Sequence, residues 1–98
     1  MKRTSNLAFN REFPAKSGRS GLPKHCPISL RRDRSNRFDE DAVGVYTTGD
    51  SEVLGWLFKK DSNRADVLKK LDAGGALDGH IEAAPPGSKV RFVVVFWL

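Results

Sequence analysis

Residues 42–57 read AVGVYTTGDSEVLGWL, in which two apolar segments are separated by turn residues. The segments at 42–46 and 52–57 have the apolar, β-branched and aromatic content that is typical of strands. Thr, Gly, Asp and Ser at 47–51 favour a turn, so the two segments are predicted to form a β-hairpin. The fold class then depends on what flanks this hairpin.

Further short strands are predicted on both sides of the hairpin. Leu7 and Phe9 alternate with polar neighbours, residues 28–31 alternate again, and residues 77–84 form a moderate strand. Residues 89–98 alternate at first and then end in the continuous apolar run VVVFWL. Such a run indicates a strand that is buried on both faces, either inside a barrel or at an interface.

One helix is predicted after the hairpin. Asp61 or Ser62 can cap its start, and the two glycines at 74–75 end it. Three- and four-residue spacings form its apolar stripe: Ala65, Val67, Leu68 and Leu71. Because strand–helix–strand units do not repeat, we predict a mostly β fold, a small antiparallel barrel with one helix plugging an end.

The charge of the chain is distributed unevenly. Its 98 residues are enough for one domain, which we expect to span residues 1–98. Residues 1–37 carry ten Lys or Arg and two acidic residues, a net charge of +8, whereas residues 38–98 have a net charge of −3. This asymmetry indicates an anionic partner, although a solubilising basic tail is the alternative. Residues 10–27 contain three prolines and scattered basic residues and are predicted to be a flexible basic loop.

The remaining composition favours a cytoplasmic protein without a membrane partner. Cys26 is the single cysteine, which favours a free thiol in a reducing compartment. No apolar segment follows the basic residues at the N-terminus, so a secretory signal is not expected. The longest apolar run, 92–98, is too short to cross a bilayer.

The sequence contains no convincing catalytic, cofactor or metal signature. Asp78 and His80 share a strand face, but two ligands make a weak metal site. The acidic triplet at 39–41 is more typical of a solvated turn than of a two-metal nuclease. Cys26 next to His25 lacks the spacing that aligns a nucleophile with a base. We therefore predict that the protein is not an enzyme and uses no cofactor or metal.

Residues 31–39, RRDRSNRFD, are the most informative segment for function. Arginine pairs bidentately with phosphate, and an aromatic ring in a polar turn offers a face on which a base stacks for about 1–3 kcal/mol. Asp39 fits such a surface if it accepts a hydrogen bond from a sugar hydroxyl, which indicates a strand terminus. The alternative is that Phe38 packs into the core and the arginines are merely solvated.

The pattern RDxxNxFDxxAVxV at residues 32–45 resembles the signature of the HIRAN domain family. The resemblance continues through Gly49, the segment 53–57 and the predicted helix to Gly75, and it covers roughly residues 28–84. It implies a modified OB-like barrel that binds the 3′ end of single-stranded DNA.

The resemblance also implies roles for individual residues. Phe38 would stack on a base and Asp39 would accept from the terminal hydroxyl, while Asn36 would orient the turn or touch the nucleotide. An aromatic pair in the first strand usually completes the family's pocket, and here Phe9 is the residue that could serve. The predicted nucleic-acid contacts are Arg32, Arg34, Asn36, Arg37, Phe38, Asp39, Trp56, Lys59 and Lys60.

Two functions follow as hypotheses. The first is recognition of single-stranded DNA or DNA ends, preferably a 3′ end, without catalysis. The second is a protein-interaction module, an adaptor or an inhibitor, including one encoded by a mobile element. In that case the apolar C-terminal strand would meet a protein partner, because an apolar edge strand invites strand addition.

Overall fold

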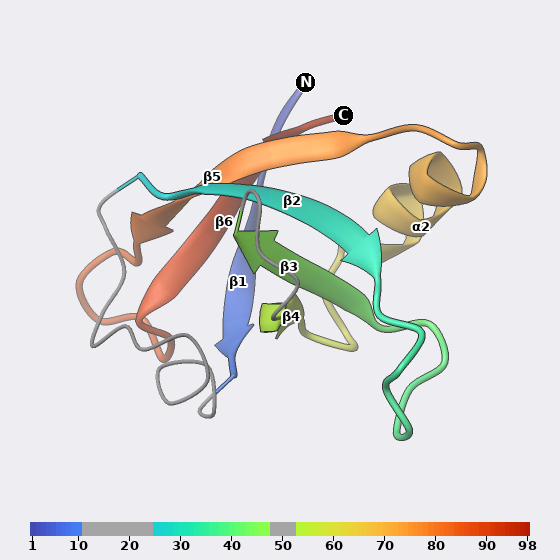
Figure 1. Cartoon of the computed structure of the whole chain (residues 1–98). Helices are drawn as coiled ribbons and strands as arrows, with labels where there is room; N and C mark the ends of the chain where they lie inside the picture. The colour runs from blue at the N-terminus through green and yellow to red at the C-terminus, as the bar shows by residue number, and fades with distance from the viewer. Residues whose placement is uncertain (11–24, 48–52) are drawn as a thin grey trace.

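The computed structural model describes residues 1–10, 25–47 and 53–98. Six antiparallel strands form a closed barrel in the order β1-β4-β3-β2-β5-β6 (Figure 1). The strands and the helix of the described part are β1 (Lys2–Phe9), β2 (Pro27–Arg32), β3 (Val43–Thr47), β4 (Val53–Leu57), α2 (Arg64–Asp72), β5 (Leu77–Ala83) and β6 (Phe92–Trp97). The predicted fold class is confirmed: the chain is mostly β, and its barrel is compatible with a small OB-like barrel.

The β3–β4 pairing carries the two strands of the predicted hairpin. Val45 lies opposite Gly55, and Gly44 lies opposite Trp56. The predicted turn at 47–51 lies almost entirely outside the described residues, as does most of the predicted basic loop at 10–27.

The interior of the barrel is filled by aliphatic side chains from every strand. β6 is the most apolar contributor, because four consecutive residues, Val93 to Phe96, are all buried. Val94 and Phe96 belong to the central core cluster, and the alternation of a strand places Val93 and Val95 on the opposite face. β6 is also hydrogen-bonded to β1 on one side and to β5 on the other. Of the two expectations for this apolar run, burial inside a barrel is the one observed, and a partner cannot add a strand along β6.

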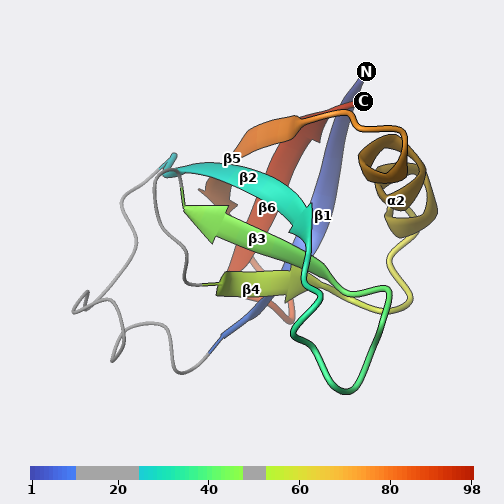
Figure 2. The ribbon, with the colours of Figure 1, turned by 45° about the vertical axis from the view of Figure 1, so that its right-hand side comes forward.

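Helix α2 lies at one end of the barrel (Figure 2). Val67 is fully buried in the core, and Leu68 and Leu71 pack against it. Ala65 is exposed, so its assignment to the apolar stripe was wrong. Among the described residues, no helix has the length and apolarity needed to span a bilayer.

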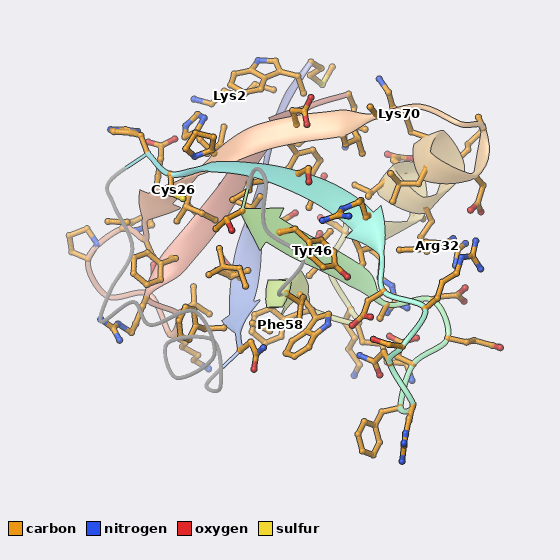
Figure 3. The ribbon with its side chains drawn as sticks, in the orientation of Figure 1. Lys2, Cys26, Arg32, Tyr46, Phe58 and Lys70 are labelled. Carbon is orange, nitrogen blue, oxygen red and sulfur yellow. The ribbon has the colours of Figure 1, made fainter. Side chains whose placement is uncertain are left out.

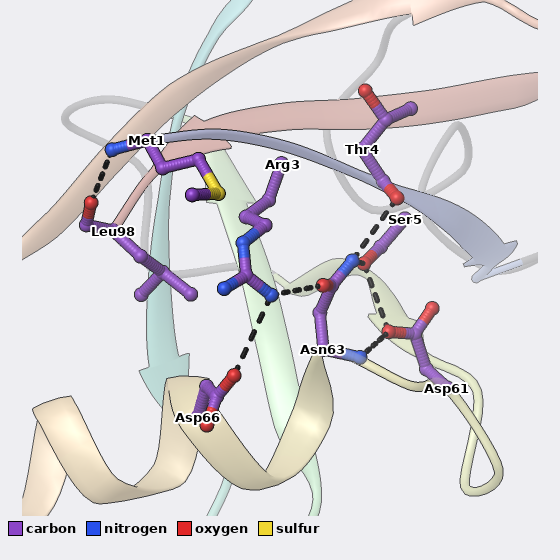
Figure 4. Close-up of polar contacts among 8 residues, drawn as sticks. All are labelled: Met1, Arg3, Thr4, Ser5, Asp61, Asn63, Asp66 and Leu98. Atoms are coloured by element: carbon purple, nitrogen blue, oxygen red, sulfur yellow. Dashed lines mark hydrogen bonds and ion pairs between the residues drawn. The ribbon is translucent and has the colours of Figure 1, made fainter.

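The start of α2 is fixed to β1 by a polar network (Figure 4). Asn63, rather than Asp61 or Ser62, occupies the cap position of the helix. Its side-chain amide donates to the Thr4 carbonyl at 3.1 Å and to the Ser5 hydroxyl at 2.9 Å. The Ser5 hydroxyl in turn donates to Asp61 at 2.9 Å. These bonds anchor the first turn of α2 on the barrel, and the site described below depends on that anchor.

At Gly79 the backbone of β5 leaves no room for a side chain beside β6. A Cβ atom at this position would lie 2.0 Å from the Val95 carbonyl oxygen. Because the obstacle is backbone, we expect Gly79→Ala to destabilise the protein by about 1–3 kcal/mol. Urea unfolding followed by circular dichroism measures this change. Asp78→Ala, at the exposed neighbouring residue, should stay within about 0.5 kcal/mol of wild type. Equal stabilities of the two variants would contradict the close approach.

Candidate nucleic-acid interface

The β2–β3 loop projects away from the barrel, and short side-chain bonds hold its shape (Figures 1 and 2). Asp33 accepts from the Ser35 backbone N–H at 3.2 Å and from its hydroxyl at 2.6 Å. Asn36 accepts from the backbone N–H groups of Phe38 at 2.9 Å and Asp39 at 3.1 Å. Asp and Asn commonly build turns in this way, because their side chains replace backbone acceptors. The sequence expectation that Asn36 orients the turn agrees with this geometry.

Phe38 stands at the outside of this loop. Its exposed fraction is 95%, the highest among the described large hydrophobic residues. The alternative in which Phe38 packs into the core is therefore excluded. Exposing an entire aromatic ring leaves a large apolar area in water, and such surfaces are common at binding sites.

Trp56, on β4, faces the same loop. Its indole N–H donates to the second carboxylate oxygen of Asp33 at 2.7 Å. Asp33 is buried, with 6% of its surface exposed, and thus ties the start of the loop to the barrel wall. Asp33 belongs to the HIRAN-like pattern at residues 32–45, but no role was predicted for it from the sequence. No local signal predicts this bond, because its two residues are 23 positions apart.

These side chains line an open pocket of about 680 Å³ between the loop, β4 and the end of β1. The loop supplies most of the polar lining, and Trp56 and Val53 supply one wall. Phe9 also lines it, as expected for the first-strand aromatic. In the part of the chain that the structure describes, the lining residues are Phe9, Asn10, Asp33, Ser35, Asn36, Arg37, Phe38, Asp39, Val53 and Trp56.

Asp39 is held by an arginine that the sequence analysis missed. The Arg64 Nη2 lies 2.8 Å from Asp39 Oδ1, and its Nη1 donates to the Lys59 carbonyl at 3.1 Å. The Arg64 hydrogen bond is the main cause that holds the pKa of Asp39 below its usual range, with a further contribution from the Asp41 backbone N–H. Asp39 is consequently an ionised acceptor at neutral pH. Arg64 is the first residue of α2, a position where acidic residues are normally favoured. This unusual position for a basic residue is the sequence signal that could have indicated a specific role.

Arg32 forms ion pairs with two acidic residues of the same chain. Its guanidinium makes a two-pronged pair with Asp72, at 2.7 and 2.8 Å, and also contacts Asp41 at 3.0 Å. The hydrogen bonds to Asp72 and Asp41 raise the pKa of Arg32 further above its usual range. Figure 3 shows Arg32 at the junction of β2 with the loop. It therefore braces the loop against the end of α2, with its charge already met by two carboxylates.

The other predicted cations surround the pocket at different distances. Arg37 is exposed and lines the pocket, whereas Arg34 lines an adjoining hollow of about 460 Å³ together with Arg32. Lys59 and Lys60 are exposed in the turn after β4 and are not part of either lining. The structure thus brings Asn36, Phe38 and Asp39 into one pocket with Trp56, and leaves the lysines at its periphery.

No protein-family model, curated protein sequence or solved structure matches this chain. The site is therefore interpreted from its geometry and from its sequence pattern.

The Asp39–Arg64 pair gives a testable pH dependence. Because the pKa of Asp39 is lowered in the folded protein, the pair stabilises the fold above the unfolded-state pKa. That contribution is lost as the pH falls through the lowered pKa. We expect Arg64→Gln to raise the pKa of Asp39 toward its ordinary value. The variant should then no longer lose the stability of this pair as the pH falls. Carboxyl ¹³C NMR titration measures the pKa. Lys69→Gln, on the same helix, should leave it unchanged, and an unaltered Asp39 titration in Arg64→Gln would contradict the pairing.

Proposed function

We propose that this chain is a HIRAN-like domain that binds single-stranded DNA at its 3′ end, without catalysis. The observation that carries the proposal is the exposed ring of Phe38 beside a pocket that contains both an aromatic wall and an ionised carboxylate. The ring and the aromatic wall suit the base of a terminal nucleotide, and the carboxylate suits its sugar hydroxyl.

The aromatic side chains suit a nucleobase better than a peptide or a metabolite with one polar end. The indole N–H of Trp56 is already used by Asp33, so the surface that Trp56 offers to a ligand is its apolar ring. Phe38 adds a second ring at the rim and Phe9 a third at the end of β1. Bases stack on such rings regardless of sequence, because every base has a π face.

Asp39 supports recognition of an end rather than of an internal nucleotide. A carboxylate accepts about four hydrogen bonds, and among the described residues Asp39 accepts from the Arg64 guanidinium and the Asp41 backbone N–H. Capacity is left for a donor such as a sugar hydroxyl, whereas a phosphate at this position would be repelled. The preference for the 3′ end over the 5′ end comes from the family resemblance.

The exposed cations fit the remainder of a strand. Arg37 lies in the pocket lining, Arg34 in the adjoining hollow, and Lys59 and Lys60 in the nearby turn. A terminal nucleotide in the pocket would lead its preceding phosphates across this surface. Arginine and lysine there supply affinity that does not depend on sequence.

Removal of the Phe38 ring tests the stacking step. We expect Phe38→Ala to weaken binding of a short 5′-labelled single strand by about 1–3 kcal/mol. Fluorescence anisotropy measures the change. Phe58→Ala is the matched control, because Phe58 is also an exposed phenylalanine but does not line the pocket. Equal losses in the two variants would contradict a stacking role for Phe38.

A 3′-phosphorylated strand tests end recognition with the wild-type protein. Phosphate at the 3′ position both removes the hydroxyl donor and places negative charge near Asp39, so we expect weaker binding than for the free 3′ end. Blocking the 5′ end should have little effect. Equal affinity for free and blocked 3′ ends would overturn end recognition, and no binding to any strand at low salt would favour the protein-interaction alternative.

The salt dependence tests the number of phosphate contacts. If Arg34, Arg37, Lys59 and Lys60 each meet one phosphate, the logarithm of the binding constant should fall with the logarithm of salt concentration with a slope of about −3. Replacing Arg34 by serine should make the slope shallower by about 0.7. Replacement of Lys89, an exposed lysine in the β5–β6 connection, should leave the slope unchanged. A wild-type slope near zero would contradict contact with the phosphates.

A further inference from the structure

A second cluster of side chains lies outside the proposed nucleotide pocket. His25, His80 and Glu82 each place one potential ligand atom so that all three atoms lie within 4.8 Å of one another. Within the cluster, the His80 Nε2 and a Glu82 carboxylate oxygen are 2.9 Å apart. From the sequence, His80 was paired only with Asp78, and two ligands are too few for a metal site. Folding supplies the missing histidine, which is 55 positions earlier in the chain.

The backbone holds this cluster in place. His80 and Glu82 are two residues apart on β5 and therefore share its outer face. Cys26, the residue after His25, accepts a hydrogen bond through its carbonyl from the Ile81 N–H at 2.9 Å. The next residue, Pro27, lies opposite His80 in the β2–β5 pairing. His25 itself has φ of +58°, a left-handed conformation that histidine adopts more readily than most residues. Two of the ligands thus come from β5, and the third comes from the turn just before β2, the strand that pairs with β5.

We propose that His25, His80 and Glu82 form a binding site for a divalent transition-metal ion of the Zn²⁺ class. Two imidazoles and one carboxylate are a donor set that Zn²⁺ uses widely, with bonds of about 2.0–2.2 Å. Ligand atoms in such a tetrahedron lie about 3–3.5 Å apart, so side-chain rotation would bring the atoms of the cluster, now within 4.8 Å, into range. The ion would take the place of the His80–Glu82 hydrogen bond.

Among the described residues, the cluster lies at the surface of the barrel. His25 is exposed, and His80 and Glu82 are half-buried. The Trp97 ring lies 5.9 Å from the His80 ring and covers one side of the cluster. Cys26 is adjacent in sequence, but its thiol is buried and directed to the Pro27 carbonyl, so it belongs to the core rather than to the ligand set. A water molecule or a group from a partner would complete the site.

The metal site and the nucleotide pocket lie at opposite ends of β2. Cys26 and Arg32, which flank and end this strand, are well separated in Figure 3. β2 is six residues long, and a strand rises about 3.3 Å per residue. The ion is therefore too distant to act on a nucleotide held at Phe38, and metal binding does not depend on the proposed function.

The metal alone tests this proposal. Titration of the protein with CoCl₂ should produce the visible absorption of a tetrahedral ion, and ZnCl₂ should displace it stoichiometrically. The chain contains only two histidines and one cysteine, so few alternative ligand sets exist. Both histidine imidazoles should shift in NMR spectra when Zn²⁺ is added. Absence of the absorption, or shifts confined to one imidazole, would overturn the site.

Single substitutions identify the ligands. His80→Ala and Glu82→Gln should each weaken Zn²⁺ binding at least about tenfold, since even outer-shell changes cost 10–100-fold. His25→Gly removes the imidazole and still tolerates positive φ, so a folding defect is avoided. Asp78→Asn is the matched control, because Asp78 is an exposed carboxylate on the same face of β5 outside the cluster. Unchanged affinity in His80→Ala, or an equal loss in Asp78→Asn, would overturn the assignment.

Discussion

Both sides of the candidate nucleotide pocket are joined through the buried carboxylate of Asp33. It accepts the Trp56 indole N–H from β4, and the backbone N–H and hydroxyl of Ser35 from the loop. A buried carboxylate without such donors would be strongly destabilising. The requirement to satisfy this charge therefore fixes the loop and the tryptophan relative to each other. The pocket is consequently built on strand ends and short turns, which hold a ligand more rigidly than a free loop does.

Helix α2 stabilises the loop from the other side. Its first residue, Arg64, binds Asp39, and its last residue, Asp72, binds Arg32. Both charges have the wrong sign for the helix dipole, which favours acids at the start and bases at the end by about 0.3–1 kcal/mol each. Asp66 in the first turn and Lys69 in the last turn follow the usual preference. Arg64 and Asp72 are exceptions because each forms an ion pair with a residue at one end of the β2–β3 loop. Helix α2 thus contributes Val67 to the core and two ion pairs to the site.

Local patterns in the sequence predicted much of the fold but few of the contacts that organise the site. Alternation and turn residues located the strands, although β1 begins at Lys2, well before the alternation at Leu7 and Phe9. The apolar run at 93–98 indicated burial on both faces, which is observed for Val93 to Phe96 but not for the exposed Trp97. Residues 31–39 were interpreted as a polar turn, in which Phe38 could equally have been buried or exposed. Long-range pairs such as Trp56 with Asp33 depend on barrel closure, which no local pattern specifies. The same reason explains why His25 and His80 were not associated from the sequence.

The structure also changes how the basic charge of the chain is interpreted. Arg32, which sequence alone would count as a phosphate ligand, is neutralised by Asp72 and Asp41. Arg64, far along the chain, is used to hold Asp39. Within residues 1–10, 25–47 and 53–98, the positive charge that is left near the pocket comes from a few exposed side chains. Under the proposed function, these charges would attract a strand to the surface but would not define how it is oriented there. In that proposal the position of the strand would come from the rings of Phe38 and Trp56 and from the carboxylate of Asp39, because a ring distinguishes a base from a phosphate and a carboxylate distinguishes a free hydroxyl from a continuing chain.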